Sequence, residues 1–348
     1  MNFRPLGRTG VQVSELCLGS MTFGAIDDGA AWRRPGGPIV SKVAHEMINR
    51  AIDAGINFID TANVYSRGRS EEIIGSALKN NGKRSSIIIS TKVQGRMSDD
   101  DPNAAGTSRR HIIEQCHASL RRLQTDYIDL YQLHRPQSDI PVDEKLRAFD
   151  DLIKDGKVRY IGTSTFAAWQ VVESLWVSKE LGLNRVICEQ PPYNILDRRI
   201  ERELIPMATT YGIGIMPWSP IAQGLLTGKY RRDRMPDEGR YTDVKKLPIV
   251  HSRRLSPDVF DVIDKLDPIA KEKNCTMSQL ALAWVLGRPG VTSPIVGPRT
   301  LAQLEDNLGA LEVVLTDSDL AQIDEIVPPK SMITPFYEAD FGPHRFKW

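Results

Sequence analysis

The chain has 348 residues and a mass of 39.0 kDa, and its 45 Lys and Arg nearly balance its 44 Asp and Glu to leave a formal net charge of +1. With 41% hydrophobic and 26% charged residues, its composition is that of a soluble globular protein and excludes a disordered chain. The near-zero net charge disfavours a protein that binds nucleic acid or a membrane surface mainly by charge. At about 150 residues per domain, the length alone suggests two domains.

The predicted elements begin at residues 3–15, where turn signals at Gly7 and Thr9-Gly10 favour a hairpin that closes the floor of a barrel. From residue 42 onwards, short apolar runs alternate with segments of helical periodicity. The predicted strands are 16–21, 57–60, 86–93, 127–134, 158–164, 185–190, 212–218 and 292–297. The predicted helices are 43–54, 71–79, 109–123, 142–154, 168–179, 200–210, 278–286 and 301–311.

Eight such units predict an α/β fold, namely a (β/α)8 TIM barrel with the N-terminal β-hairpin and an extra C-terminal helix at 317–326. Gly55, Gly156 and Gly182 stand just before predicted strands, where a left-handed residue commonly ends a helix. The polar stretch 230–257 is expected to be a long loop. The units take about 270 residues, which favours a single domain over 1–348 in place of two.

Neither a targeting segment nor a cysteine-based site is indicated. The N-terminus, MNFRPLGRTG, lacks the apolar core of a signal peptide, and no stretch approaches the roughly 18 apolar residues that span a bilayer. The four cysteines lie far apart and form no Cys-x-x-Cys pair. We therefore expect a cytoplasmic protein with reduced thiols, no metal and no nucleic-acid or membrane partner.

Polar side chains recur at the C-terminal ends of five consecutive predicted strands. Because side chains alternate along a strand, each of these groups falls on the same face as the inward apolar residues before it. This end of the strands is where TIM-barrel active sites are built. The residues are Asp60, Lys92, His134, Ser164 and Gln190.

Taken singly, these residues have structural explanations. An Asp at a strand end usually caps a turn, a Lys there usually reaches solvent, and a His on an apolar face is usually part of the core. Asp60, Lys92 and His134, however, converge from adjacent strands, and Tyr65 follows in the loop after Asp60. This convergence favours a catalytic group over four unrelated structural residues.

The segments FIDTANVY (58–65), STKV (90–93) and QLHRP (132–136) resemble the signature segments of the aldo-keto reductases, whose Asp, Tyr, Lys and His tetrad matches Asp60, Tyr65, Lys92 and His134. Further segments extend the resemblance over nearly the whole chain, and it is strongest to the microbial branch that is similar to potassium-channel β-subunits. These segments are PLGRTGVQVSELCLGSMTFG, GKVRYIGTSTF, MPWSPIAQGLLTGKY and PIVGPRTLAQLEDNLGAL. The resemblance implies an NADPH-dependent enzyme of the alcohol dehydrogenase (NADP) type, which reversibly reduces an aldehyde or ketone to an alcohol.

Carbonyl reduction requires a hydride donor at the carbon and a proton donor at the oxygen, where negative charge develops. Tyr65 fits the role of general acid and base. Lys92 fits as the cation that favours the phenolate, with Asp60 as the counter-charge of the buried ammonium. His134 would hydrogen-bond the carbonyl oxygen and orient it.

The resemblance implies that NADPH is bound without the Gly-x-Gly-x-x-Gly fingerprint, which the sequence lacks. Ser164 and Gln190 match the positions that bond the nicotinamide carboxamide, although Thr165 replaces the more usual Asn beside Ser164. Trp218 matches the aromatic residue that stacks on the nicotinamide. The loop over the pyrophosphate matches Ser219, Ile221, Gly224, Leu225 and Lys229.

The adenosine end of the cofactor site matches five residues at the eighth strand and the helix after it. A helix N-terminus and the Arg299 guanidinium suit a 2′-phosphate, which favours NADPH over NADH. Asp306 stands where Glu is commoner in the family. The five residues are Gly297, Arg299, Gln303, Asp306 and Asn307.

The substrate, expected to be a small-molecule carbonyl compound, should contact Met21, Phe23 and Trp32 near the first strand. The aromatic C-terminal tail either covers this pocket or packs on the barrel exterior or on another subunit, which leaves a homo-oligomer open. Its aromatic residues are Phe336, Tyr337, Phe341, Phe346 and Trp348.

Two other classes of function stay open. One is a nucleotide-sensing regulatory subunit of the channel-β type, which would bind the cofactor and turn over slowly. The other is a Schiff-base aldolase that uses Lys92 as its nucleophile. Two motif fragments carry less weight, because GLLTGK (224–229) is one residue short of a P-loop and GTSTF (162–166) lacks a glycine of the hydrolase nucleophile elbow.

Overall fold

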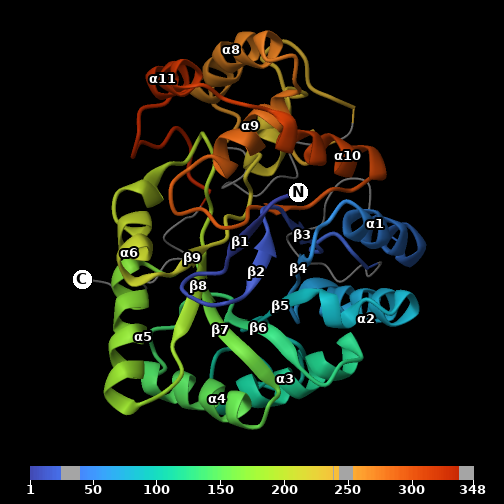
Figure 1. The fold of residues 1–348 in the computed structure, drawn as a ribbon, viewed down its shortest axis with the longest axis vertical. Helices are drawn as coiled ribbons and strands as arrows, with labels where there is room; N and C mark the ends of the chain where they lie inside the picture. The colour runs from blue at the N-terminus through green and yellow to red at the C-terminus, as the bar shows by residue number, and fades with distance from the viewer. Residues whose placement is uncertain (25–39, 238, 243–253, 337–348) are drawn as a thin grey trace.

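A computed structural model describes residues 1–24, 40–237, 239–242 and 254–336 (Figure 1). Eight parallel strands form one sheet in the order β10-β3-β4-β5-β6-β7-β8-β9. The strands are β3 (Cys17–Gly19), β4 (Phe58–Asp60), β5 (Ile88–Val93), β6 (Ile128–Leu133), β7 (Val158–Ser164), β8 (Val186–Gln190), β9 (Gly214–Ile215) and β10 (Ile295–Val296).

Backbone hydrogen bonds join the two ends of this sheet. The N–H of Thr292 donates to the carbonyl of Ile215, and the N–H of Ile295 donates to that of Pro217, both at 2.8 Å. These bonds curl the sheet into a ring, which confirms the predicted (β/α)8 barrel. The seventh and eighth strands are shorter than predicted because Pro217 and Pro294, inside the predicted runs, have no N–H to donate.

The N-terminal hairpin lies at the floor of the barrel, as predicted. Strands β1 (Phe3–Pro5) and β2 (Gln12–Ser14) pair antiparallel. Leu6 and Val13 are buried and pack with the interior side chains of the barrel, such as Phe58. Gly7 has a positive φ of 60°, and a Cβ there would lie 2.5 Å from the carbonyl oxygen of Ile187, so only glycine fits this close approach.

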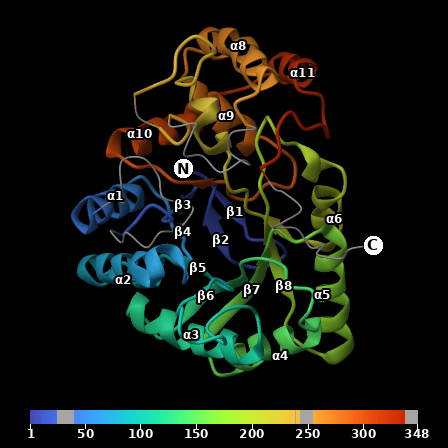
Figure 2. The ribbon, with the colours of Figure 1, turned by 180° about the vertical axis from the view of Figure 1, so that it is seen from behind.

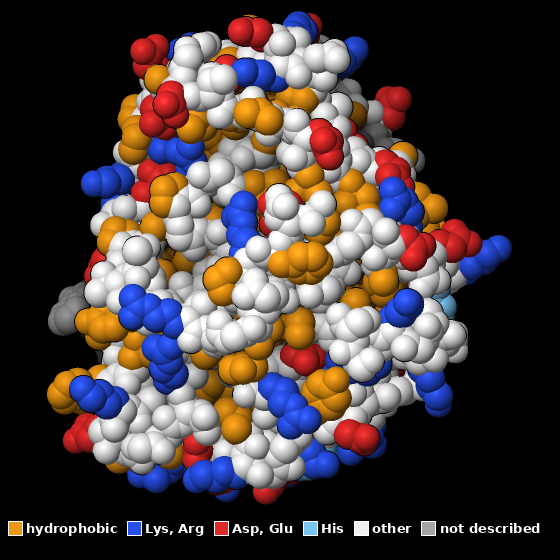
Figure 3. Space-filling view, viewed as in Figure 1, with side chains coloured by type: hydrophobic (Ala, Val, Ile, Leu, Met, Phe, Trp, Pro, Cys, Tyr) orange, Lys and Arg blue, Asp and Glu red, His pale blue; other side chains and the backbone are white. Residues whose placement is uncertain are grey.

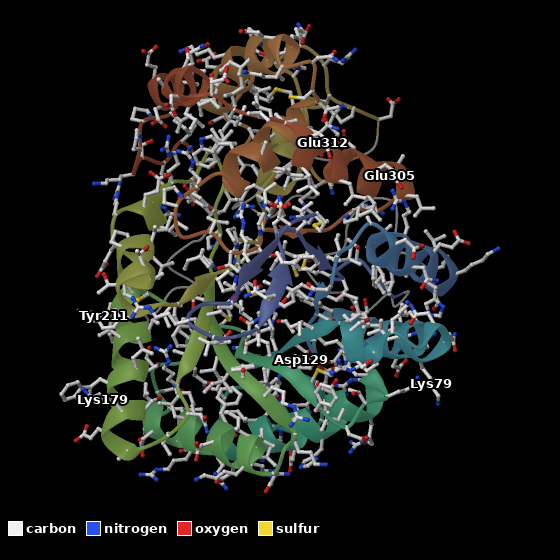
Figure 4. All side chains as sticks on the ribbon, in the orientation of Figure 1. Lys79, Asp129, Lys179, Tyr211, Glu305 and Glu312 are labelled. Atoms are coloured by element: carbon white, nitrogen blue, oxygen red, sulfur yellow. The ribbon has the colours of Figure 1, made fainter. Side chains whose placement is uncertain are left out.

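Helices surround the sheet on its outer side (Figures 1 and 2). The side chains of Lys79 and Lys179 point away from the ring on opposite sides of the molecule, whereas Asp129, in β6, lies inside the outline of the fold (Figure 4). The predicted helices are all present: α1 (Ser41–Asp53), α2 (Arg69–Asn81), α3 (Arg109–Leu123), α4 (Val142–Lys154), α5 (Ala168–Leu181), α6 (Leu204–Tyr211), α9 (Met277–Leu286), α10 (Leu301–Gly309) and the extra α11 (Asp317–Ile326).

Helix α8 (Pro257–Glu272) is not predicted from the sequence, although Ser256-Pro257 is a helix-start signal. The Ser256 hydroxyl accepts a hydrogen bond from the N–H of Val259, and Pro257 occupies the first helical turn. Val259 and Ile263 bury the inner face of α8 in a second core, which it shares with α9 and α11 on one side of the barrel. The loop predicted over 230–257 contains no helix or strand in its described residues up to Ser256, and α8 begins at its last residue, Pro257.

Both signs of charge are interspersed over the face seen in Figure 3, in keeping with the balanced composition. All four cysteines are free thiols, and Cys17, Cys116 and Cys188 are buried. Within the described ranges, no three His, Cys, Asp or Glu side chains are grouped to hold a metal ion. The helices of the described part of the chain include none long and apolar enough to cross a membrane.

Candidate active site at the carboxyl ends of the strands

A buried ion pair joins two of the predicted residues across neighbouring strands. The Lys92 ammonium donates to Asp60 Oδ2 at 2.6 Å and to the Thr61 carbonyl at 2.7 Å. The side chain of Lys92 has no exposed surface, and Asp60 is 3% exposed. Burial acts to lower the pKa of Lys92, but the Asp60 carboxylate and then the Tyr65 phenol outweigh it, so the pKa lies above its usual value.

The second oxygen of Asp60 binds polar side chains from two other strands. Asp60 Oδ1 accepts hydrogen bonds from Ser90 Oγ and from Gln190 Nε2, each at 2.9 Å. The Gln132 amide in turn donates to Ser90 Oγ at 2.7 Å. Side chains from β4, β5, β6 and β8 therefore form one hydrogen-bonded network inside the barrel, and this network holds the Asp60 carboxylate in place.

Tyr65 and His134 lie beside this pair. The Lys92 Nζ atom is 5.2 Å from the centre of the Tyr65 ring, and the Tyr65 and His134 rings meet edge to face with their centres 5.7 Å apart. Ser66 and Arg67 have positive φ values of 48° and 50°, a conformation that is unusual for two consecutive non-glycine residues and typical of functional sites. This turn places Tyr65 over the mouth of the barrel.

His134 is half-buried at the end of β6. Burial of the imidazole, with the charges of Arg135 and Lys92, lowers the pKa of His134 well below its usual value. The ring is therefore neutral at pH 7, with one N–H donor and one acceptor nitrogen. A neutral imidazole can donate one hydrogen bond to a ligand at the mouth of the barrel.

The residues expected at the nicotinamide end lie next to the tetrad. The Ser164 hydroxyl donates to the Gln190 carbonyl at 3.0 Å, and these two residues pair between β7 and β8. Trp218 is half-buried, and its indole N–H has no hydrogen-bond partner among the described residues. The Arg135 guanidinium lies 5.9 Å from the centre of the Trp218 ring.

The expected pyrophosphate loop follows β9 and contains the short 3-10 helix η4 (Ala222–Thr227). Ser219 and Gly224 have positive φ values of 57° and 100°, so the backbone turns sharply here. Ile221 and Leu225 pack in the second core, and Leu225 has no exposed surface. These two residues therefore offer backbone groups to a ligand, since their side chains are used in packing.

Positive charge gathers around Lys229 at the end of this loop. Burial and the charges of Arg299 and Arg240 lower the pKa of Lys229. Burial also lowers the pKa of Arg240, to which the charges of Arg254 and Arg299 contribute. Neighbouring cations favour a bound anion, and this cluster consists of Lys229, Arg240, Arg254 and Arg299.

Arg240 and Arg254 are not among the site residues predicted from the sequence. Both guanidinium groups donate to Gln223 Oε1, Arg254 at 3.0 Å, so they converge on the loop that holds Lys229. Tyr241 packs edge to face on Tyr230 with ring centres 5.3 Å apart, which pins the segment that carries Arg240. Residue periodicity does not predict that Arg240 approaches Gln223, because Arg240 belongs to a loop.

At the adenosine end, Gly297 follows β10 and α10 begins at Leu301. The Arg299 N–H donates to Gln303 Oε1 at 2.8 Å. The Asp306 carboxylate accepts a hydrogen bond from the Thr276 hydroxyl at 2.9 Å, and Asn307 is 5% exposed. Asp306 is thus partly engaged by the start of α9.

The three residues expected at the substrate differ in position. Phe23 has no exposed surface and packs in the core between sheet and helices, while Met21 is half-buried. Trp32 lies outside the described residues, as do the aromatic tail residues after Phe336. Phe336 is buried in the second core, and the Arg254 guanidinium lies 4.6 Å from the centre of its ring.

Comparisons of the sequence with known proteins all indicate the same family. The model of the aldo/keto reductase family matches residues 15–328. A probable voltage-gated potassium channel subunit beta of Oryza sativa subsp. japonica is 37% identical over 341 residues, covering 97% of this chain and 100% of the relative. An uncharacterized oxidoreductase, YrpG, of Bacillus subtilis (strain 168) is 37% identical over 343 residues, covering 96% of this chain and 98% of the relative.

A putative voltage-gated potassium channel subunit beta of Schizosaccharomyces pombe is also 37% identical, with 93% of each chain covered. The predicted similarity to the potassium-channel β-subunits is thereby confirmed. The chain belongs to the aldo/keto reductase family of NAD(P)H-dependent oxidoreductases.

Proposed function

We propose that the protein reversibly reduces an aldehyde or ketone to an alcohol with NADPH, and that Tyr65 is the general acid and base. The observation that carries this proposal is the convergence on Tyr65 of a buried, charged lysine and a neutral histidine, with Lys92 Nζ 5.2 Å from the Tyr65 ring centre. The cofactor supplies the hydride when bound. The enzyme as a whole is then of the alcohol dehydrogenase (NADP) type.

The tetrad performs the proton transfer in this proposal. A carbonyl oxygen gains negative charge as the hydride arrives, and the Tyr65 hydroxyl gives it a proton. The Lys92 ammonium stabilises the phenolate that remains, while Asp60 balances the buried charge. The neutral His134 ring donates its N–H to the same carbonyl oxygen, which orients the substrate.

The cofactor preference rests on the cationic cluster. NADPH differs from NADH by a 2′-phosphate, and guanidinium groups bind phosphate oxygens through parallel hydrogen bonds. We infer that Arg299, with Lys229 and Arg240, binds the phosphates, while Trp218, Ser164 and Gln190 meet the nicotinamide. Met21 and, by expectation from the sequence, Trp32 face the carbonyl substrate.

A Schiff-base aldolase is the weaker alternative. Such an enzyme needs a neutral lysine amine as the nucleophile, which requires a lowered pKa. The pKa of Lys92 is instead raised, and two of its ammonium hydrogens are bound by Asp60 and Thr61. This geometry supports a resident charge in place of a nucleophile.

A nucleotide-sensing subunit is the second candidate, because two of the relatives above are named as channel β-subunits. Such a protein would bind NADPH as tightly as an enzyme does. It would differ in turnover, so the rate with a good carbonyl substrate separates the two functions.

The decisive experiment measures NADPH oxidation with a panel of aldehydes and ketones, beginning with para-nitrobenzaldehyde, and repeats it with NADH. We expect turnover with NADPH, and we expect Tyr65→Phe to lower kcat by at least about 100-fold, since it removes the transferred proton. NADPH binding, followed by quenching of tryptophan fluorescence, should persist in the variant. Full activity of Tyr65→Phe would refute the assignment of the acid.

We further propose a single domain over residues 1–348, located in the cytoplasm, whose partners are small molecules. Limited proteolysis that yields two independently folded fragments would contradict the single domain. Light scattering of the purified protein determines whether it forms a homo-oligomer.

A further inference from the structure

Besides Asp60, a buried carboxyl group lies one residue before Gln190. Glu189 is in β8, and its side chain has no exposed surface. Its neighbours Cys188 and Gln190 point into the barrel, where Cys188 joins the interior cluster and Gln190 binds Asp60. Because side chains alternate along a strand, Glu189 points to the opposite face, towards the layer of helices.

The Glu189 carboxyl has few partners for a buried acid. Oε1 accepts a hydrogen bond from the Phe166 N–H at 3.0 Å, while Oε2 is buried with no hydrogen-bond partner among the described residues. Burial raises the pKa of Glu189 to about 8, against the opposing effects of the Thr163 hydroxyl, the N–H groups of Phe166 and Thr165, and the Arg135 charge. The group is therefore mostly a neutral carboxylic acid at pH 7.

The bond to Phe166 is one of three that tie the turn after β7 to β8. The Ser164 hydroxyl and the Thr165 N–H both donate to the Gln190 carbonyl, at 3.0 and 3.1 Å. Phe166 completes the set through the Glu189 carboxyl. Ser164, Thr165 and Phe166 are thus all held by two consecutive residues of β8, Glu189 and Gln190.

This turn has an unfavourable backbone conformation. Thr165 has a φ of 60°, in the left-handed region that a β-branched residue seldom adopts. The Thr165 hydroxyl donates to the Ser164 carbonyl at 2.6 Å and accepts from Arg135 Nη1 at 3.3 Å. Such a conformation persists only when surrounding bonds hold it, and the Glu189 carboxyl supplies one of them.

The turn also reaches the catalytic groups. Arg135 directly follows His134 and donates to its carbonyl oxygen at 2.8 Å. Ser164, at the start of the turn, and Gln190, which receives two of its bonds, are the residues proposed to meet the nicotinamide carboxamide. A change in the turn would therefore move both carboxamide contacts together.

We propose that Glu189 is a positioning residue for the nicotinamide end of the cofactor site, because its carboxyl holds the Ser164–Phe166 turn in the left-handed conformation that aligns Ser164 with Gln190. This inference rests on the proposed function. Glu189 touches neither substrate nor cofactor, and it acts through the turn.

The test compares NADPH with 2′-phospho-ADP-ribose, a fragment that lacks the nicotinamide, by titration calorimetry. We expect Glu189→Ala to weaken NADPH binding about tenfold, as the loss of one positioning bond predicts, and to change fragment binding by less than about twofold. Glu189→Gln keeps the acceptor oxygen and a neutral group, so both ligands should bind within about twofold of the unchanged protein. A role in general stability would weaken both ligands alike.

A second substitution tests the conformational part of the proposal. Glycine adopts a positive φ readily, so in a Thr165→Gly background the turn needs less support from Glu189. We expect Glu189→Ala to weaken NADPH binding by less than about threefold in that background, a non-additive result. Additive losses would overturn the proposal. Glu189→Leu fills the same space without an acceptor and serves in place of Glu189→Ala if that variant does not fold.

The outcomes separate this inference from the function on which it rests. Unchanged NADPH affinity in both Glu189→Ala and Glu189→Leu, or equal losses for NADPH and the fragment, would overturn the positioning role alone. Failure of the unchanged protein to bind NADPH would instead overturn the proposed function. Rescue by Glu189→Gln together with a selective loss in Glu189→Ala supports the proposal.

Discussion

Asp60, inside the barrel, and Glu189, in the layer between sheet and helices, are both buried carboxyl groups, and their surroundings differ. Inside the barrel, Asp60 binds the Lys92 ammonium and accepts two further hydrogen bonds. On the outer face of β8, Glu189 binds one backbone N–H and leaves an oxygen without a partner among the described residues. A buried carboxyl can carry charge where a cation and donors meet it, and it becomes neutral where they do not.

Breaking the Asp60–Lys92 pair should have the largest effect. Lys92→Met leaves the Asp60 carboxylate buried without its cation, which should cost about 3–5 kcal/mol of unfolding free energy. Activity should fall by at least about 100-fold, because Tyr65 loses the charge that favours its phenolate. Urea unfolding and steady-state kinetics measure the two losses separately.

A double variant separates these two effects. Asp60→Asn in the Lys92→Met background removes the uncompensated charge, so a large part of the lost stability should return while activity stays low. A double variant that is as unstable as Lys92→Met would show that packing, and not the buried charge, causes the loss. Recovered activity would contradict the role of Lys92.

The pH dependence of stability should reveal the neutral Glu189. Its pKa is about 8 in the folded protein against an ordinary 4.5, so the folded state keeps a proton that the unfolded chain releases. The stability from this group is complete below about pH 4.5 and falls as the pH rises to about 8, by up to about 1.4 kcal/mol per pH unit. Glu189→Gln should remove this slope.

The measurement is the difference in unfolding free energy between Glu189→Gln and the unchanged protein, taken in urea at about pH 5.5 and 7.5. Other groups that titrate in this range affect both proteins and cancel in the difference. The same difference at both pH values would show that Glu189 is ionised in the folded protein, and the contrast with Asp60 would then be lost.

An exposed carboxylate gives the smallest effect. Arg110 and Glu114 form an ion pair one helical turn apart on α3, with Nε and Oε1 at 2.9 Å and side chains 58% and 51% exposed. Arg110→Ala should change the unfolding free energy by less than about 0.5 kcal/mol, and the change should vanish in about 1 M salt. A larger effect would imply that pairing, more than burial, determines how much each carboxylate contributes to the unfolding free energy.

Much of the fold follows from local patterns in the sequence. Among the described residues, the alternation of apolar runs and helical segments predicts all eight strands of the barrel and every α-helix except α8, because residue periodicity reports which face of an element is buried. The phase of β4 and β5 likewise predicts that Asp60 and Lys92 lie on one side of the sheet. Helix α8 was obscured by the long polar stretch before it, although its start signal was present.

The candidate site is only partly predictable from the sequence. Residues at strand ends are brought together by the barrel, so Asp60, Lys92 and His134 can be named in advance. Arg240 and Arg254 cannot, since they reach Gln223, in the loop before Lys229, from a loop and from the segment before α8. The complete burial of Phe23 could not be predicted either, because it depends on the residues packed around it.

By itself, the sequence determined the order of the elements, the faces of the strands and the family motifs, because each depends on residues close together in the chain. The tertiary structure alone decided which polar groups acquired partners. Gln190 reaches Asp60 across 130 residues of sequence, while the neighbouring Glu189 accepts a hydrogen bond from Phe166 in the turn after β7. Burial and charge depend on what packs against a side chain, and residues distant in sequence supply those neighbours.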